Sequence, residues 1–273
     1  MISIIVAVYN QLEMNKLFVE SLNRYSTLPF ELIIIDNGST DGSAEFFEGV
    51  GAKVIRNSGN YSYPVCQNIG IKNAKYDIYA FLNNDIIVSP KWDERFVEVM
   101  KRNGLDIVTS CGIERMESKQ IKKFYRKKWS KIKELVGFFF GQGRFSLKLM
   151  HRLMYGNWEQ FCEKRFSRFG YRAEEAFVGN CVIMTKRAVE LIGLWDERIQ
   201  AADYDLYLRS KKRSLETGDI KPVHVALGIW VHHYIRLTVK GGYPPFVDRA
   251  NIISPEEKWG EQTVENYLSY IKI

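Results

Sequence analysis

Residues 2–10 read ISIIVAVYN and indicate the fold class of the chain. The apolar residues of this stretch are mostly β-branched and run on without polar alternation, which is typical of a strand buried on both faces of a parallel sheet. A helix should follow, because apolar residues recur at helical spacing from Met14 to Tyr25. The next apolar run, residues 32–35, then completes a strand-helix-strand unit.

The same alternation continues through the first 110 residues and predicts an open α/β sheet. Further helices are expected after Asp41, near 65–75, at 92–102, at 187–192 and at 204–211, and further strands near 53–55, at 78–82, at 106–111 and at 180–185. The run Ser254-Pro255-Glu256-Glu257 predicts the start of a last helix with its apolar face at 264–271, since it combines a capping serine, proline at the first position and glutamate three residues after the cap.

The composition is that of a globular protein. The chain has 273 residues, 46% hydrophobic and 26% charged, which excludes collagen-like, disordered and coiled-coil classes. Residues 1–10 lack the features of a signal peptide, and no apolar run reaches the roughly 18 residues of a membrane span. The four cysteines lie far apart without metal-ligand spacing. We therefore expect a cytoplasmic protein with reduced, mostly buried thiols.

The basic charge is confined to one segment. The net charge is +7, but residues 114–172 hold sixteen Lys and Arg against five Glu, a local +11, which leaves 7 − 11 = −4 for the rest. No helix-turn-helix, zinc-finger or RNA-binding signature accompanies this segment. We therefore expect no nucleic-acid partner.

Polar residues follow three of the predicted strands. Tyr9-Asn10, residues 36–42 (DNGSTDG) and Asn83-Asn84-Asp85 each stand where an apolar run ends. Ligands of open α/β sheets bind beyond the carboxyl ends of the strands, so these loops are candidates for a site. Taken alone, DNGSTDG serves equally well as a turn with a helix cap.

No glycine-rich phosphate loop is present. The sequence lacks G-x-G-x-x-G after the first strand, G-x-x-x-x-G-K-[ST] anywhere, and the G-x-S-x-G elbow. An enzyme that handles nucleotides without such a loop can neutralise phosphates with a divalent cation held by carboxylates. This makes Asp85, at a strand end, a candidate metal ligand.

Four separated motifs together resemble the family 2 glycosyltransferases, including rhamnosyltransferase-like members. They are SIIVAVYN (3–10) with IIIDNGSTDGS (33–43), RNSGNYSYPVCQNIGIKNA (56–74) with YAFLNNDIIVSPKW (79–92), VGNCVIMTKRAVELIGLWDERIQAADYDLYLR (178–209), and WVHHY (230–234). The resemblance implies a GT-A-type fold, with a Rossmann-like, mostly parallel central sheet flanked by helices, a basic helical insertion and a C-terminal helix. We expect one domain, 1–273, with a nucleotide-sugar-binding half at 1–112, the insertion at 113–175 and an acceptor and catalytic half at 176–273.

The resemblance also implies roles for individual residues. Asp36 would accept from the ring N–H of the nucleotide base, with Tyr9 and Asn10 lining the same pocket. The donor would further contact Asn57, Asn60, Asn68, Gly70, Asn83 and Asn84. Asp85 would bind Mn²⁺ or Mg²⁺ with a third ligand from His232 or His233, between which the sequence does not choose. Asp203 would be the general base, with Asp205 as a further substrate-binding residue.

Two positions depart from the family pattern. Asn83 replaces the first aspartate of the D-x-D-like motif, and Ala202 replaces the acidic neighbour of Asp203. The expected reaction is metal-dependent, inverting transfer of a sugar from a UDP-, dTDP- or GDP-sugar to a hydroxyl of a glycan or lipid-linked acceptor. The alternatives are a sugar-nucleotide nucleotidyltransferase and a non-catalytic carbohydrate- or nucleotide-binding module. Without the motif context, Asp203 would be a helix cap.

Residues 114–172 admit two interpretations. Seven Lys and Arg between 122 and 133 precede the apolar stretch 135–140, and more apolar residues follow up to 153. The segment could be a helical lid whose lysines face water. Basic residues beside exposed aromatic ones also suit an anionic membrane surface, and the protein would then be cytoplasmic but attached to the membrane periphery.

Overall fold

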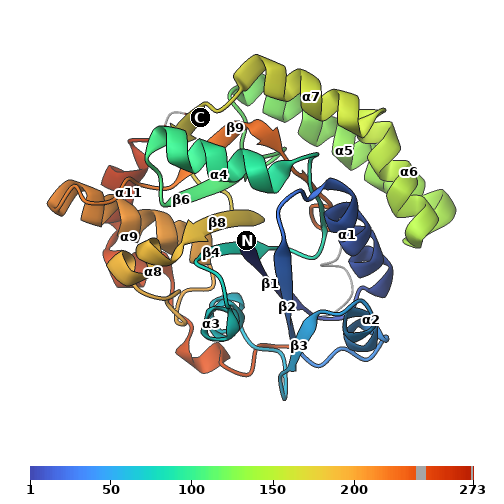
Figure 1. Ribbon diagram of the computed structural model, residues 1–273, viewed down its shortest axis with the longest axis horizontal. Coiled ribbons are helices and arrows are strands. Elements are labelled where there is room, and N and C mark those ends of the chain that lie inside the picture. The colour runs from blue at the N-terminus through green and yellow to red at the C-terminus, as the bar shows by residue number, and fades with distance from the viewer. Residues whose placement is uncertain (238–243, 272) are drawn as a thin grey trace.

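One central sheet of eight strands, in the order β3-β2-β1-β4-β8-β6-β9-β7, organises the molecule (Figure 1). The computed structural model describes residues 1–237, 244–271 and 273. The strands are β1 (Ile2–Val8), β2 (Phe30–Asp36), β3 (Lys53–Arg56), β4 (Ile78–Leu82), β6 (Ile107–Cys111), β7 (Ala173–Glu175), β8 (Cys181–Thr185) and β9 (His224–Trp230). Four of the seven pairings are parallel, and β8 runs antiparallel to both of its neighbours. The mostly parallel sheet predicted from the sequence is confirmed.

Helices cover both faces of this sheet. They are α1 (Leu12–Tyr25), α2 (Ser43–Gly49), α3 (Tyr63–Asn73), α4 (Trp92–Asn103), α8 (Lys186–Ile192) and α9 (Ala202–Glu216). Ile4 and Val6 of β1 belong to the core cluster that includes α1 and α4, whereas Ile5 belongs to the cluster that includes α3 and α9. Successive side chains of a strand point to opposite faces, so β1 is buried on both, as its composition predicts.

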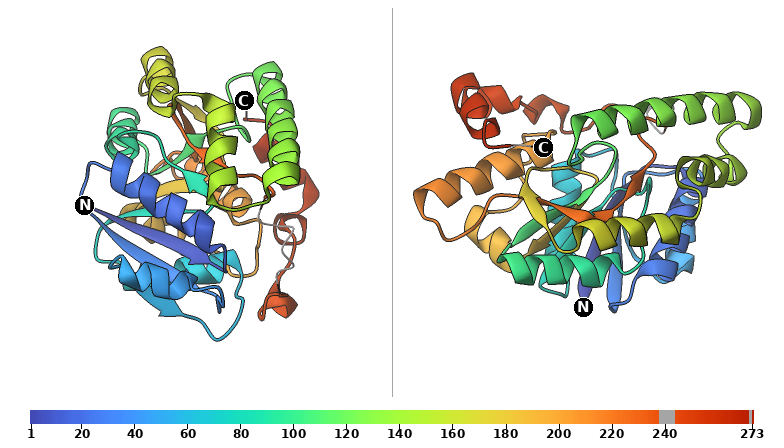
Figure 2. Two further views of the ribbon diagram at one scale, coloured as in Figure 1. Left: turned by 90° about the vertical axis from the view of Figure 1, so that its right-hand side faces the viewer. Right: turned by 90° about the horizontal axis from the view of Figure 1, so that it is seen from above.

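The basic segment folds into three helices, α5 (Lys119–Phe140), α6 (Arg144–Tyr155) and α7 (Trp158–Phe169). Their inner faces form a cluster of their own, in which Trp129, Val136 and Met150 pack with Leu227 and Trp230 of β9. Figure 2 shows α5 and α6 as a hairpin that reaches past the sheet. The helical insertion predicted for this region is confirmed.

The C-terminal helix differs from the prediction. The predicted cap is present, since Ser254 and Glu257 form a complete capping box. The chain then breaks at Gly260, which has a φ of 75°, so that α10 (Pro255–Trp259) and α11 (Glu261–Leu268) replace a single helix. Glycine adopts this left-handed conformation without the steric penalty of a Cβ, which explains the break.

The cysteines and the helix lengths were also the subject of predictions from the sequence. All four cysteines, Cys66, Cys111, Cys162 and Cys181, are buried and free. Burial raises the pKa of each thiol, which keeps the side chains protonated and unreactive. Among the residues that the structure describes, no helix is both long and apolar enough to cross a membrane.

Candidate active site

The site lies at the carboxyl ends of β1 and β4. β1 has β2 on one side and β4 on the other, so the chain order reverses there, and such a switch point leaves a crevice between the following loops. A short antiparallel ribbon, β5 (Ile86–Ile87) with β10 (His232–His233), stands beside this crevice. The ribbon pairs Ile87, within the motif at 79–92, with His232, within the motif at 230–234, although the two residues are 145 positions apart in the chain.

Two adjoining cavities occupy the crevice. The first, of about 850 Å³, is lined by residues from the loops after β1, β2 and β4 and by Pro244–Phe246, Arg249 and Ile252. The second, of about 440 Å³, is lined by Glu114, Arg115, residues 177–180, Ala202, Asp203 and His233. Tyr63, Asn83 and Gln200 line both cavities. The two therefore form one cleft.

Asp36 ends β2 directly before Asn37, which lines the first cavity, but is not itself one of the lining residues. One carboxylate oxygen, Oδ2, accepts from the backbone N–H groups of Gly38 and Ser39, at 3.2 and 3.1 Å. The other oxygen, Oδ1, is buried and has no hydrogen-bond partner among the described residues. A buried acceptor without a donor costs free energy, so Oδ1 is a position where a bound N–H group would be favoured.

Asn37 is a cavity residue that the sequence did not single out. It lines the first cavity, and its Nδ2 donates to Asn60 Oδ1 at 3.2 Å and to the Tyr61 carbonyl at 3.0 Å. Asn57 donates in turn from Nδ2 to Asn37 Oδ1, at 2.8 Å. Asn60 itself lines the first cavity, whereas Asn57 orients Asn37. The only sequence signal for Asn37 is its place directly after Asp36.

The residues after β1 separate into two roles. Tyr9 lines the first cavity, as expected. Asn10 does not, because its Oδ1 accepts from the Thr40 N–H at 2.8 Å and its own N–H donates to Ser39 Oγ at 2.8 Å. Asn10 has a φ of 56°, a conformation that non-glycine residues seldom adopt. It ties two loops together, and its expected place in the pocket lining is corrected.

Asn68 and Gly70 support α3 and do not line the cleft. Asn68 donates from Nδ2 to the carbonyl of Trp195 and to Glu197 Oε1, both at 2.9 Å, and accepts from the Trp195 N–H at 3.0 Å. A Cβ at Gly70 would lie 2.1 Å from Cγ2 of Ile5 on β1. The expectation that both residues contact the donor is therefore corrected: Asn68 anchors a loop, and Gly70 lets α3 approach the sheet.

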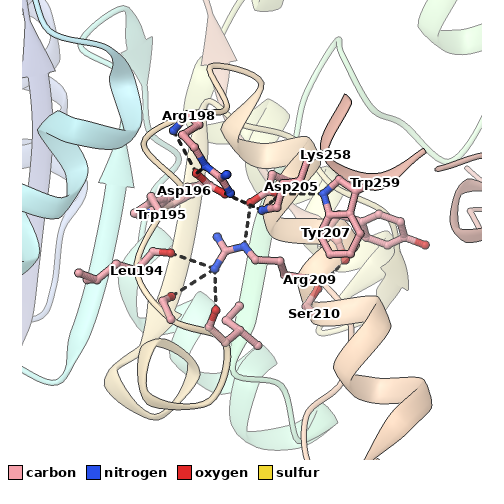
Figure 3. A network of polar contacts seen from close by, with 12 residues as sticks. Leu194, Trp195, Asp196, Arg198, Asp205, Tyr207, Arg209, Ser210, Lys258 and Trp259 are labelled. Atoms are coloured by element: carbon pink, nitrogen blue, oxygen red, sulfur yellow. Dashed lines mark hydrogen bonds and ion pairs between the residues drawn. The ribbon is translucent and has the colours of Figure 1, made fainter. Parts of the chain in front are cut away.

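Asp205 is also structural. Its side chain is 1% exposed and accepts from Arg209 Nε at 2.7 Å, from Lys258 Nζ at 2.6 Å and from Trp259 Nε1 at 2.9 Å (Figure 3). Lys258 also pairs with Asp196, at 2.8 Å. This network ties α9 to α10, and Asp205 does not line either cavity. Its expected contact with substrate is corrected.

The run Asn83-Asn84-Asp85 leaves β4 between the two cavities. Asn83 lines both cavities, and its N–H donates to the Asn180 carbonyl at 3.0 Å. Asn84 lines the first cavity, and its Nδ2 donates to Asn15 Oδ1 at 2.7 Å. Asp85 is buried, and its carbonyl oxygen accepts from the N–H of Tyr234, just after the ribbon.

His233 lies between two carboxylates. Its Nε2 is 3.1 Å from Asp85 Oδ1, and its Nδ1 is hydrogen-bonded to Glu114 Oε1. Asn180 Nδ2 donates to the same Glu114 oxygen, at 3.1 Å. Burial alone would lower the pKa of His233, but the charges of Asp85 and Glu114 outweigh burial and hold the pKa well above 6.5. The imidazole is therefore cationic while both carboxylates are ionised and face it.

His232 faces away from Asp85. It precedes His233 in the ribbon, and successive strand side chains point to opposite sides. Its ring is fully buried among Trp129, Tyr155 and Tyr234, and its Nδ1 lies 2.7 Å from His151 Nδ1. Burial holds the pKa of His232 well below 6.5. Of the two expected metal ligands, the structure turns only His233 toward Asp85, so His232 is corrected to a core residue.

Asp203 projects into the second cavity from the first turn of α9. The helix begins at Ala202, so Asp203 is not the cap residue. Burial raises the pKa of Asp203, while hydrogen bonds from backbone N–H groups and the charge of Arg115 partly offset it. A Cβ at Gly179 would lie 2.9 Å from Asp203 Oδ2, so only glycine leaves room for this carboxylate.

Glu114 and Arg115 are further cleft residues that the sequence did not single out. They follow β6 and precede the basic helices, in a stretch without a recognisable motif. Glu114 Oε2 is buried without a partner among the described residues, and Arg115 donates to the backbone carbonyl of Ile273. Only their position at the carboxyl end of a strand could have indicated them.

The fold of the chain is similar to that of a known structure. The structures of S. aureus TarS residues 1–349 in complex with UDP and with UDP-GlcNAc each align with a TM-score of 0.54. They are 14% and 13% identical and cover 100% of this chain and 66% and 67% of that chain. At such identities the likeness supports the GT-A-like fold and nothing more.

Curated sequences add relatives of the same kind. The uncharacterized glycosyltransferase EpsJ of Bacillus subtilis is 30% identical over 122 residues, which is 43% of this chain and 35% of EpsJ. The uncharacterized glycosyltransferase RT0329 of Rickettsia typhi is 24% identical over 219 residues, which is 77% of this chain and 58% of RT0329. The chain thus spans between about a third and three fifths of these relatives. The family model "Glycosyl transferase family 2" matches residues 3–158, more than half of the 273 residues, and the chain therefore belongs to glycosyl transferase family 2.

Proposed function

We propose that this chain transfers a sugar from a nucleoside-diphosphate sugar to a hydroxyl of a glycan or lipid-linked acceptor, with inversion at the anomeric carbon. One observation carries the proposal: the cavity lined by Asn37, the residue after Asp36, shares Asn83 with a second cavity that is lined by Asp203. A donor in the first cavity would direct its sugar toward the second. The acceptor hydroxyl would enter between that sugar and Asp203.

The first cavity suits the nucleotide. Asp36 directly precedes the cavity residue Asn37, and its Oδ1 has no hydrogen-bond partner in the part of the chain that the structure describes. This supports recognition of a ring N–H, which uracil, thymine and guanine all carry. The TarS complexes contain UDP and UDP-GlcNAc, which favours a UDP-sugar over dTDP- and GDP-sugars for this chain. Arg249 lines the same cavity and supplies a positive charge.

The residues beside Asn83 suit a divalent ion. Two ligands about 2.1 Å from an octahedral ion lie about 3 Å apart when they are adjacent, and Asp85 Oδ1 and His233 Nε2 are 3.1 Å apart. No three His, Cys, Asp or Glu side chains form a ready-made metal cluster in the described part of the chain. Mg²⁺ typically takes one or two protein ligands and completes its shell with waters and substrate phosphates. A Mn²⁺ or Mg²⁺ ion between Asp85 and His233 would displace the proton that the imidazole holds on Nε2, because only the neutral ring can bind a metal. Held there, the ion would neutralise the charge that grows on the leaving diphosphate.

Asp203 would act as the general base. Its carboxylate accepts the proton of the acceptor hydroxyl, whose oxygen forms the new bond to the anomeric carbon while the bond to the diphosphate breaks. The nucleoside diphosphate leaves with the electron pair of that bond. Because the oxygen attacks from the face opposite the diphosphate, the configuration is inverted.

Release of nucleoside diphosphate tests the proposal. Purified protein is incubated with UDP-, dTDP- and GDP-sugars in Mn²⁺, in Mg²⁺ or in EDTA, with and without sugar acceptors, and free nucleoside diphosphate is measured. We expect nucleoside diphosphate to be released from donors that carry one of the three bases, and this release to be lost in EDTA. The Asp203→Asn variant should bind the donor normally but show no turnover. Glu98→Gln, on the surface of α4, is the matched control and should keep full activity.

Other outcomes would contradict the proposal. Donor binding without release under any condition would favour the binding module. Pyrophosphate formed from a nucleoside triphosphate and a sugar phosphate would favour the nucleotidyltransferase. Full activity in EDTA would overturn the metal assignment, and full activity of Asp203→Asn would overturn the base.

A further inference from the structure

The end of α5 and the start of α6 carry a cluster of exposed apolar side chains. The exposed fractions are 60% for Leu135, 82% for Phe138, 69% for Phe139, 56% for Phe140 and 68% for Phe145. The four rings form a continuous chain, with centroid distances of 5.1 Å from Phe138 to Phe139, 6.4 Å from Phe139 to Phe140 and 5.7 Å from Phe140 to Phe145. A contiguous exposed apolar patch of this kind marks a binding surface more often than chance exposure does. We call these five residues the aromatic tip.

The tip continues along α5 as a mixed stripe. Phe124, Lys127, Lys131, Leu135 and Phe138 are all exposed and follow one another at intervals of three or four residues, so they share one face of the helix. The opposite face, with Trp129 and Val136, is buried against the insertion core. The lid interpretation of this segment thus describes only the inner face. The outer face of a 22-residue helix, about 33 Å long, is left uncovered by the described residues.

The lysines of the outer face are available to an external anion. Arg144 and Lys148 pair with Glu20, and Arg165 pairs with Glu117. By contrast, Lys123, Lys127 and Lys131 make no ion pair with any acidic side chain that the structure describes. Lys127 and Lys131 lie within the stripe, between its apolar residues, and Lys123 directly precedes Phe124.

We propose that the outer face of α5 and the aromatic tip bind the surface of an anionic lipid bilayer. The aromatic rings would enter the boundary between headgroups and acyl chains, and the lysines would contact the phosphates. A protein partner fits less well, because the centre of a protein interface is depleted in lysine, whereas this stripe has Lys127 and Lys131 between Phe124 and Leu135. The proposal does not depend on the reaction proposed above.

Vesicle flotation tests this surface. The whole chain is mixed with phosphatidylcholine vesicles with and without phosphatidylglycerol, at low and high salt. We expect binding only to the anionic vesicles, weakened by salt. Phe138→Ser/Phe139→Ser and Lys127→Glu/Lys131→Glu should each lower the bound fraction about tenfold or more.

Matched controls separate the surface from general effects. Leu215→Ser removes a similarly exposed apolar residue from α9, and Lys101→Glu/Lys212→Glu reverses two exposed lysines on α4 and α9. Both controls should bind vesicles as the parent chain does. All variants change exposed side chains and should keep the parent melting temperature and the parent rate of nucleotide release.

Four results would overturn the proposal. They are absence of binding to anionic vesicles, equal binding to neutral vesicles, unchanged binding in both surface variants, and equal loss in the controls. Self-association that is lost in Phe138→Ser/Phe139→Ser, without vesicle binding, would assign the patch to a second copy of the chain instead. Loss of nucleotide release with vesicle binding intact would count against the reaction and not against this surface.

Discussion

Replacing Asp205 by asparagine should destabilise the fold by about 3 kcal/mol without changing the nucleotide affinity of the folded protein. The carboxylate is 1% exposed and faces two cations, Arg209 and Lys258, whose side chains are 13% and 17% exposed. Asparagine has nearly the same shape, so packing is preserved while the charge is lost. Both cations then remain buried beside a neutral amide.

The magnitude follows from the partners that each cation keeps. Breaking a buried ion pair by removing one partner costs about 3–5 kcal/mol. Arg209 also donates to the carbonyls of Ile192 and Leu194, at 2.7 and 2.9 Å, and Lys258 also pairs with Asp196. These contacts place the cost at the lower end of the range. At about 2–4 °C per kcal/mol, the melting temperature should fall by about 6–12 °C.

Two measurements on the same variant check this reasoning. Denaturant unfolding gives the free energy of unfolding, and calorimetric titration with nucleoside diphosphate gives the affinity well below the melting temperature. Glu98→Gln removes an exposed ion pair to Arg102 on α4 and should change the free energy of unfolding by no more than about 0.5 kcal/mol. A stable Asp205→Asn protein with weakened nucleotide binding would refute the structural role and restore Asp205 to the substrate.

Three further predictions concern the cleft and its support. Because burial raises the pKa of Asp203, kcat/KM should rise with pH through a midpoint above about 4, the usual value for aspartate, and a profile still flat at pH 4 would exclude Asp203 as the base. Gly70→Ala places a Cβ 2.1 Å from Ile5 and should lower the free energy of unfolding in urea by about 1–3 kcal/mol. Weaker nucleotide binding without a loss of stability would contradict the structural role of Gly70. Glu114→Gln removes the charged partner of His233 and should weaken Mn²⁺ binding about 10–100-fold in an electron paramagnetic resonance titration, whereas unchanged affinity would separate Glu114 from the metal.

Features that depend on near neighbours in the chain could be predicted from the amino-acid sequence. The β-branched run of β1 predicted a strand buried on both faces, and Ser254 predicted a complete capping box, because both patterns act within a few residues. The motif order predicted the family that the comparison confirms over residues 3–158. The motifs also indicated Asp85 and Asp203 as candidate site residues. In the structure, Asp85 contacts His233 of the ribbon, and Asp203 lines the second cavity.

Which members of each motif face the cleft could not be predicted from the sequence, because it depends on tertiary packing. Asp203 and Asp205 lie two residues apart on α9, about 200° around the helix axis, so one enters the second cavity and the other the buried network. The choice between His232 and His233 follows from the pairing of β10 with β5, because a shift of one residue would exchange their faces. Glu114 reaches His233 across 119 residues of chain, a contact that no local pattern records. Strand register and helix rotation are set by packing against distant segments, and so the orientation of a side chain at the site is a property of the whole fold.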